Sequence, residues 1–169
     1  MKPLLVRDLM TVGVPTCPAD TPLVDLVRTM LERNWEAVVV LDGKDGQAIG
    51  VVSQDEIVQA YIRPNARSLT AQDVMSDGVP SIPPDIPVTA AAGIMRDRGV
   101  RTLFLMHNAA GIIYPAAYIS YWHILRHLAA RDESELADLG IAADRQSPIE
   151  TFKQKRDAAR RRVQTRAKE

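Results

Sequence analysis

The chain has 169 residues, which suits one domain of ordinary size or two small halves that share a core. Charged residues make up 25%, with 21 Lys+Arg against 21 Asp+Glu, so the zero net charge excludes a uniformly basic nucleic-acid-binding protein. The one cysteine, Cys17, excludes an internal disulfide and a cysteine-rich zinc site.

No apolar stretch is long enough to span a bilayer, and the N-terminus lacks the apolar run of a secretory signal. We therefore expect a cytoplasmic protein with no membrane contact. Known catalytic motifs are also missing from the sequence, so we expect no enzymatic activity. His123 and His127 lie four residues apart on an expected helix, but the sequence offers no third ligand, and we expect no metal site.

The first half of the chain predicts a helix, a hairpin and a second helix. Asp20 and Pro22 are typical of a helix start, and apolar residues follow at helical spacing from Leu23 to Leu31. Two short apolar runs, Ala37–Leu41 and 48–52, flank the Gly-rich turn 42–46 and predict a hairpin. A helix is expected over Gln54–Tyr61.

The second half repeats this order. Residues 72–87 match residues 7–22 with an offset of 65, and Ser120 matches Ser53 with an offset of 67. The repeat predicts a helix from Val88, strands over 103–106 and 112–119, the latter broken by Pro115, and a helix over 121–130. Because each half is too small for a strong core, we expect the two halves to pack together.

The duplicated pattern resembles a pair of CBS domains, or Bateman module, over about residues 4–130. The resemblance rests on the openings Asp8-Leu9-Met10 and Asp73-Val74-Met75, and on the strand-to-helix junctions at Ser53 and Ser120. It implies an α/β (α+β) fold of two tandem repeats, 4–63 and 68–130, each roughly β-α-β-β-α and packed pseudo-symmetrically. It further implies a non-catalytic homodimer that binds AMP, ADP or ATP between the repeats, with S-adenosylmethionine as the less favoured ligand.

Ser53 and Glu56 are the first candidate ligand residues. A serine at a helix start places its hydroxyl beside free backbone amides, which suits a phosphate, and a carboxylate three residues later can accept hydrogen bonds from both ribose hydroxyls. The second repeat has Ser120 and His123, and neutral imidazole offers one acceptor rather than two. We therefore expect the Ser53 and Glu56 pocket to be the occupied one. Ser53 and Glu56 also form a capping box, which requires no ligand.

Further ligand contacts follow from the resemblance. Adenine is expected beside strands that carry Val14, Thr16 and Val52 in the first repeat and Val79 and Ser81 in the second. Arg101 occupies a position that meets phosphate in the family, whereas the first repeat has Glu36 there, which would repel phosphate. The aromatic cluster of Tyr118, Tyr121 and Trp122 suits either base stacking or, as we favour, a dimer interface.

Residues 131–169 are expected to form an acidic linker, with a short helix over 135–139, followed by a basic helical arm. Residues 150–169 contain eight Lys or Arg against three acids. The arm, residues 147–169, suits either a solvated helix anchored by Ile149 and Phe152 or a contact with an unknown protein partner. We do not favour nucleic acid, because no aromatic residue follows Phe152. The alternative is a scaffold or interaction protein that acts through this arm and whose clefts, narrowed by Phe104, no longer bind a ligand.

Overall fold

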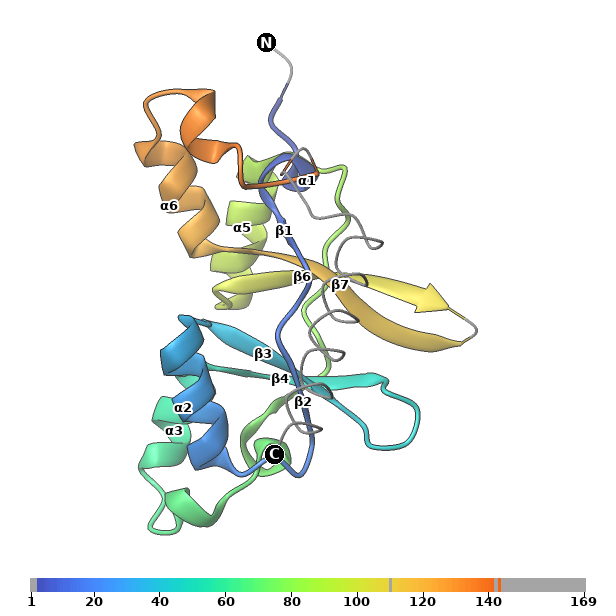
Figure 1. Ribbon diagram of the computed structural model, residues 1–169, viewed down its shortest axis with the longest axis vertical. Coiled ribbons are helices and arrows are strands. Elements are labelled where there is room, and N and C mark those ends of the chain that lie inside the picture. Colours follow the sequence, from blue (N-terminus) through green and yellow to red (C-terminus); the bar gives the residue numbers. More distant parts are fainter. Residues whose placement is uncertain (1–2, 110, 142, 144–169) are drawn as a thin grey trace, which may run out of the picture.

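The computed structural model describes residues 3–109, 111–141 and 143. Two halves, each a β-sheet with helices packed on it, are stacked along the longest axis of the molecule (Figure 1). The mixed α/β fold of two tandem repeats is therefore confirmed. No helix of these residues is both long enough and apolar enough to cross a bilayer.

The lower half in Figure 1 contains a four-stranded sheet with the strand order β2-β3-β4-β5. Its strands are β2 (Thr16–Pro18), β3 (Ala37–Leu41), β4 (Ala48–Ser53) and β5 (Ser76–Asp77). Its helical segments are α2 (Leu23–Arg33), α3 (Gln54–Tyr61), η1 (Ala66–Ser68) and α4 (Ala71–Val74). Leu26 and Met30 of α2 and Ala60 of α3 are buried in one cluster with Val38 and Val52, because both helices turn their apolar residues toward the same face of the sheet.

The upper half contains a three-stranded sheet with the order β1-β7-β6. Its strands are β1 (Thr11–Val12), β6 (Thr102–Ala109) and β7 (Ile112–Ser120), and its helical segments are α1 (Val6–Leu9), α5 (Val88–Arg98), α6 (Tyr121–Ala129) and η2 (Glu133–Leu136). Helices α2 and α5 end in the left-handed conformation at matching positions, Asn34 with φ 53° and Gly99 with φ 65°. The duplication seen in the sequence thus extends to the backbone.

The opening segment of each repeat packs on the other half (Figure 1). Strand β1 joins the upper sheet, where Thr11 pairs with Tyr118, and β5 joins the lower sheet, where Ser76 pairs with Val51. The two pairs are related by the same offsets of 65 and 67 that relate the sequence repeats. Because the segments are exchanged, neither half completes its sheet without the other repeat.

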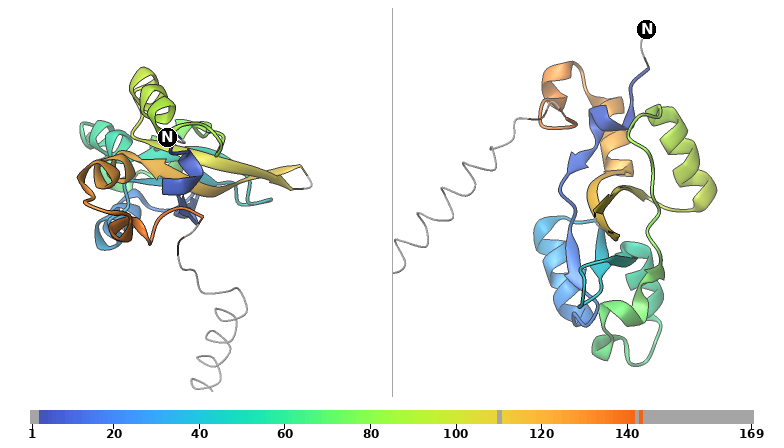
Figure 2. Two further views of the ribbon diagram at one scale, coloured as in Figure 1. Left: turned by 90° about the horizontal axis from the view of Figure 1, so that it is seen from above. Right: turned by 90° about the vertical axis from the view of Figure 1, so that its right-hand side faces the viewer.

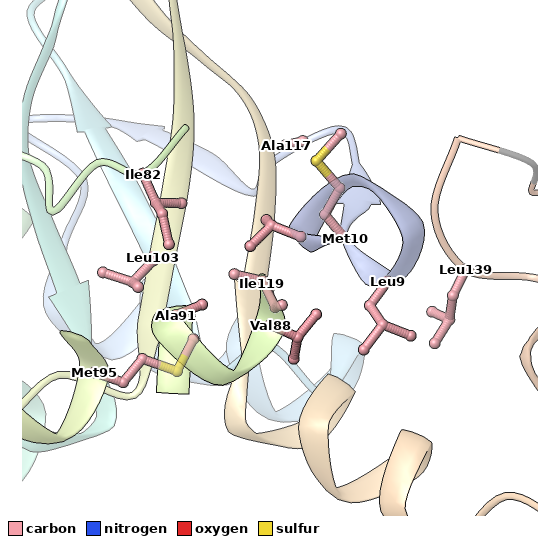
Figure 3. Packing of buried hydrophobic residues seen from close by; sticks show 11 residues of the cluster. Leu9, Met10, Ile82, Val88, Ala91, Met95, Leu103, Ala117, Ile119 and Leu139 are labelled. Carbon is pink, nitrogen blue, oxygen red and sulfur yellow. The ribbon is translucent and has the colours of Figure 1, made fainter. Parts of the chain in front are cut away.

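Gly50 allows β5 to lie against β4. A Cβ atom at this position would come within 2.5 Å of the carbonyl oxygen of Ser76 and 2.6 Å of the sulfur of Met75. The matching position of the second repeat holds Ala117, which is buried beside Met10 (Figure 3). The two exchanged contacts are therefore similar in pairing but not in side-chain packing.

The core has three parts. One lies in each half, and Figure 3 shows the upper one, where side chains from α1, α5, β6 and β7 converge. The third lies between the two sheets and contains the buried residues Ala37, Val39, Val51 and Phe104. We call this contact between the halves the seam. Burial of apolar side chains at the seam holds the repeats together.

Two details differ from the sequence-based expectations. Strand β7 continues through Pro115, because a register shift between Leu105 and Met106 of β6 accommodates the proline. A short helix expected at 135–139 is instead the 3₁₀ helix η2, which caps the upper core with Leu139 close behind it. The expected basic arm, residues 147–169, lies outside the described residues.

Candidate functional site

A cavity of about 900 Å³ opens on one side of the seam, a volume in the range of small-molecule sites. Both repeats line it. The first repeat contributes Pro15, the end of α2, the start of β3 and the start of α3, and the second contributes β7 and α6. Among the lining residues are Glu36, Ala37, Gln54, Tyr118, Ser120, Trp122 and His123.

His123 is locked into a hydrogen-bond network at the wall of this cavity. The backbone N–H of Ser120 donates to Nδ1 of His123 at 3.0 Å, so the ring proton is on Nε2, which lies 2.8 Å from Oγ1 of Thr11. The imidazole is 1% exposed, and burial, together with the positive charge of Arg126, lowers the pKa of His123 to about 4. His123 is therefore neutral at pH 7, and both ring nitrogens are already bonded.

Two aromatic side chains stand beside His123 on the same wall. The rings of Tyr118 and Trp122 are both perpendicular to the imidazole, with ring centres 5.3 and 5.2 Å from it. The guanidinium of Arg126 lies 4.7 Å from the centre of the Trp122 ring and is held by Asp138 at 2.8 Å. These contacts fix two aromatic rings in the cavity wall, where a planar ring can stack on them.

From the repeat offset of 67, Ser53 and Glu56 are the counterparts of Ser120 and His123 and belong to the opposite side of the seam. They do not line this cavity, although Gln54, Ile57 and Val58 of the same segment do. The backbone N–H of Ser53 donates to Oε2 of Glu56 at 2.8 Å, and the Ser53 hydroxyl donates to the same oxygen. The expected capping box is therefore formed. Arg101 is on this side too, since its guanidinium pairs with Asp55 across the seam at 3.0 Å.

The remaining predicted ligand residues lie in different parts of the fold. Val14 and Val79 pack against the seam cluster, Thr16 is an exposed residue of β2, and Ser81 forms a single bridge to Phe104. Val52 is fully buried in the lower core, and its side chain faces away from the seam. Neighbouring strand residues point to opposite faces, and Val51 has the seam position.

The structure thus brings Ser120 and His123 together in a cavity and leaves Ser53, Glu56 and Arg101 on the other side of the seam. Thr11 was not expected at the site. Its contact with His123 joins residues 112 positions apart, and nothing in the local sequence signals it. The exchange of β1 between the halves creates this contact.

Three comparisons with known proteins agree with this architecture. An uncharacterized protein of Methanopyrus kandleri is 27% identical over 132 residues, which are 77% of this chain and 64% of that protein, so the chain spans less than two thirds of its length. The crystal structure of an uncharacterized conserved protein from Pyrococcus horikoshii matches with a TM-score of 0.66 and 16% identity, covering 79% of this chain and 98% of that one.

The CBS domain pair of protein MJ0100, solved in complex with 5′-methylthioadenosine and S-adenosyl-L-methionine, has a TM-score of 0.64 and 16% identity and covers 77% of this chain and 99% of that one. At these identities the solved structures show a shared fold. The sequence profile of the CBS domain matches residues 6–63 and 71–130. With both repeats matched and the paired fold observed, the chain belongs to the CBS domain family.

Proposed function

We propose that this protein is a non-catalytic regulatory module that binds an adenosine-containing ligand at the seam. The observation that carries the proposal is the cavity of about 900 Å³ built from both repeats, with Tyr118 and Trp122 fixed in its wall. A ligand there contacts both halves, so binding favours one relative placement of the repeats over others. The related domain pair of MJ0100 holds two adenosine-containing molecules, which supports this ligand class.

The nucleotides AMP, ADP and ATP are proposed for the Ser53 side of the seam. Arg101 supplies a cation there, and the hydroxyl of Ser53 lies at the first turn of α3. One carboxylate oxygen of Glu56, Oε2, is used in the cap of α3, because it accepts hydrogen bonds from both the N–H and the hydroxyl of Ser53. This side is the second candidate position, after the cavity.

Isothermal titration calorimetry with AMP, ADP, ATP, S-adenosylmethionine and 5′-methylthioadenosine tests the proposal. We expect heat with at least one ligand, and we expect Trp122→Ala to weaken binding in the cavity by about 1–2 kcal/mol, the scale of one lost base-stacking contact. Glu56→Ala is the comparison variant, because Glu56 belongs to the other proposed position and does not itself line the cavity.

The two variants decide where the ligand lies. Weakening by Glu56→Ala alone contradicts the cavity as the site and moves it to the Ser53 side. No heat with any ligand contradicts the regulatory reading and favours a scaffold that acts through residues 147–169, the arm that we propose as the contact with a protein partner.

We also propose that the protein forms a homodimer through α3 and α6. Exposed apolar side chains lie on both helices, with Tyr61 84% exposed on α3 and Leu128 81% exposed on α6. Large apolar side chains exposed on surface helices are typical of an interface. We expect a dimer in sedimentation velocity and a monomer for Leu128→Asp, whereas Ile113→Asp, on the distant β6–β7 hairpin, is expected to leave the dimer intact. A monomeric wild-type protein rejects the proposal.

A further inference from the structure

The two sides of the seam differ in charge at one pair of matching positions. Glu36 of the first repeat and Arg101 of the second are related by the repeat offset of 65. The half-buried Glu36 lines the cavity. Arg101 lies on the other side, paired with Asp55. The cavity therefore has a carboxylate where the opposite side has a guanidinium.

The Glu36 carboxylate is not neutralised by a neighbour. Within the described part of the chain it forms no ion pair. Its charge reaches Tyr118, because burial and the negative charge of Glu36 both raise the pKa of that phenol. The Glu36 carboxylate and the Tyr118 ring therefore face the same cavity.

The positive groups near the cavity are poorly placed to hold a phosphate. Of the described lining residues Arg33 is the basic one, and it is exposed at the end of α2 with its guanidinium 5.9 Å from the centre of the Trp35 ring. Arg126 is engaged by Asp138 behind Trp122. His123 is neutral, and its two nitrogens are bonded to Ser120 and Thr11. A phosphate inside the cavity thus meets the Glu36 carboxylate, while Arg33, the charged base among the described lining residues, is exposed and lies over Trp35.

We propose that the cavity selects adenosine-containing ligands that carry no negative charge at the 5′ position, such as a thioether or sulfonium nucleoside, and rejects nucleotides. This inference rests on the proposed function and narrows the ligand class. A phosphate monoester carries nearly two negative charges at pH 7, and its repulsion from a carboxylate within about 8 Å weakens binding roughly tenfold or more at the effective dielectric of a protein surface. Aromatic rings and a carboxylate together favour a sulfonium cation.

Tryptophan fluorescence reports on this cavity specifically. The chain contains two tryptophans, and both Trp35 and Trp122 line the cavity. The candidate nucleotide residues Ser53, Glu56 and Arg101 do not line the cavity that holds the two rings. Titrations of the full chain with 5′-methylthioadenosine and AMP at one ionic strength therefore compare the two ligands at one site.

We expect 5′-methylthioadenosine to bind at least tenfold more tightly than AMP. We expect S-adenosylmethionine to bind about threefold more tightly than S-adenosylhomocysteine, the thioether that has the same amino-acid group but lacks the sulfonium charge. Glu36→Gln removes the charge with little change in shape, so AMP should gain about tenfold while 5′-methylthioadenosine changes less than twofold. Glu133→Gln, which removes an exposed carboxylate that does not line the cavity, is the matched control and should leave the ratio between the two ligands unchanged.

Two results overturn the inference while leaving the proposed function in place. One is AMP binding as tightly as 5′-methylthioadenosine, and the other is an AMP affinity that Glu36→Gln does not raise. A failure of these four ligands and of ADP and ATP to bind, by fluorescence and by calorimetry, overturns the proposed function itself, and this inference with it.

Discussion

Phe104→Ala is expected to lower the free energy of unfolding by about 4 kcal/mol, the largest effect of any single truncation at the seam. Phe104 is 1% exposed and lies between the two sheets, packed with Val39 and Val51. Truncation removes the apolar contact area of the ring and leaves a hole that two sheets with exchanged strands cannot easily close. Urea denaturation, with the slope compared between variants, measures this loss.

Two controls separate the seam from general damage to the core. Phe104→Leu keeps most of the volume and is expected to cost about 1 kcal/mol, a typical value for an apolar substitution that largely conserves volume. Val39→Ala removes less apolar volume from the same cluster, so its loss of unfolding free energy should lie between those of Phe104→Leu and Phe104→Ala. A loss below about 1 kcal/mol for Phe104→Ala contradicts the view that apolar packing at the seam holds the repeats together.

His123→Gln is expected to remove part of the acid sensitivity of the fold. The folded-state pKa of His123 is about 4, against 6.5 for an unperturbed histidine, because the ring is buried and Arg126 lies nearby. Between these values the unfolded chain binds the proton and the folded chain does not. The contribution of neutral His123 to the free energy of unfolding is thus fully present above pH 6.5 and is lost as the pH falls toward 4.

The size of this effect follows from the shift. The difference of about 2.5 between the two pKa values lowers the free energy of unfolding by roughly 3 kcal/mol from pH 7 to pH 4. Glutamine retains an acceptor for the N–H of Ser120 and a donor for Thr11 but does not titrate, so the variant should lose less stability over the same range. Denaturation curves at pH 7, 5.5 and 4 measure the difference. Equal pH dependence in both proteins contradicts a neutral, buried His123.

The duplication made the fold predictable from the sequence. Offsets of 65 and 67 placed the helices and hairpins of both halves, and the capping box at Ser53 formed as its spacing indicates. Matched repeats imply matched elements, and the observed pairs Thr11 with Tyr118 and Ser76 with Val51 follow the same offsets. Local patterns were sufficient here because each element is defined within about twenty residues.

The cavity was less predictable because it depends on contacts between distant segments. Val51 and Val52 are equally apolar, so alternation along the strand indicates opposite faces but not which face meets the seam. The contact of Thr11 with His123 arises from the exchanged strand β1. The sequence indicates that Glu36 repels a phosphate, but only the packing of α2, α3 and α6 places this residue in the cavity wall.

A crystal structure of the protein grown with 5′-methylthioadenosine tests the central claim most directly. We predict that the adenine ring lies in the cavity beside Trp122 and Tyr118 and contacts residues of both repeats. Ligand found only on the Ser53 side, or a cavity that stays free of ligand while binding is measured in solution, contradicts the assignment of this cavity as the binding site.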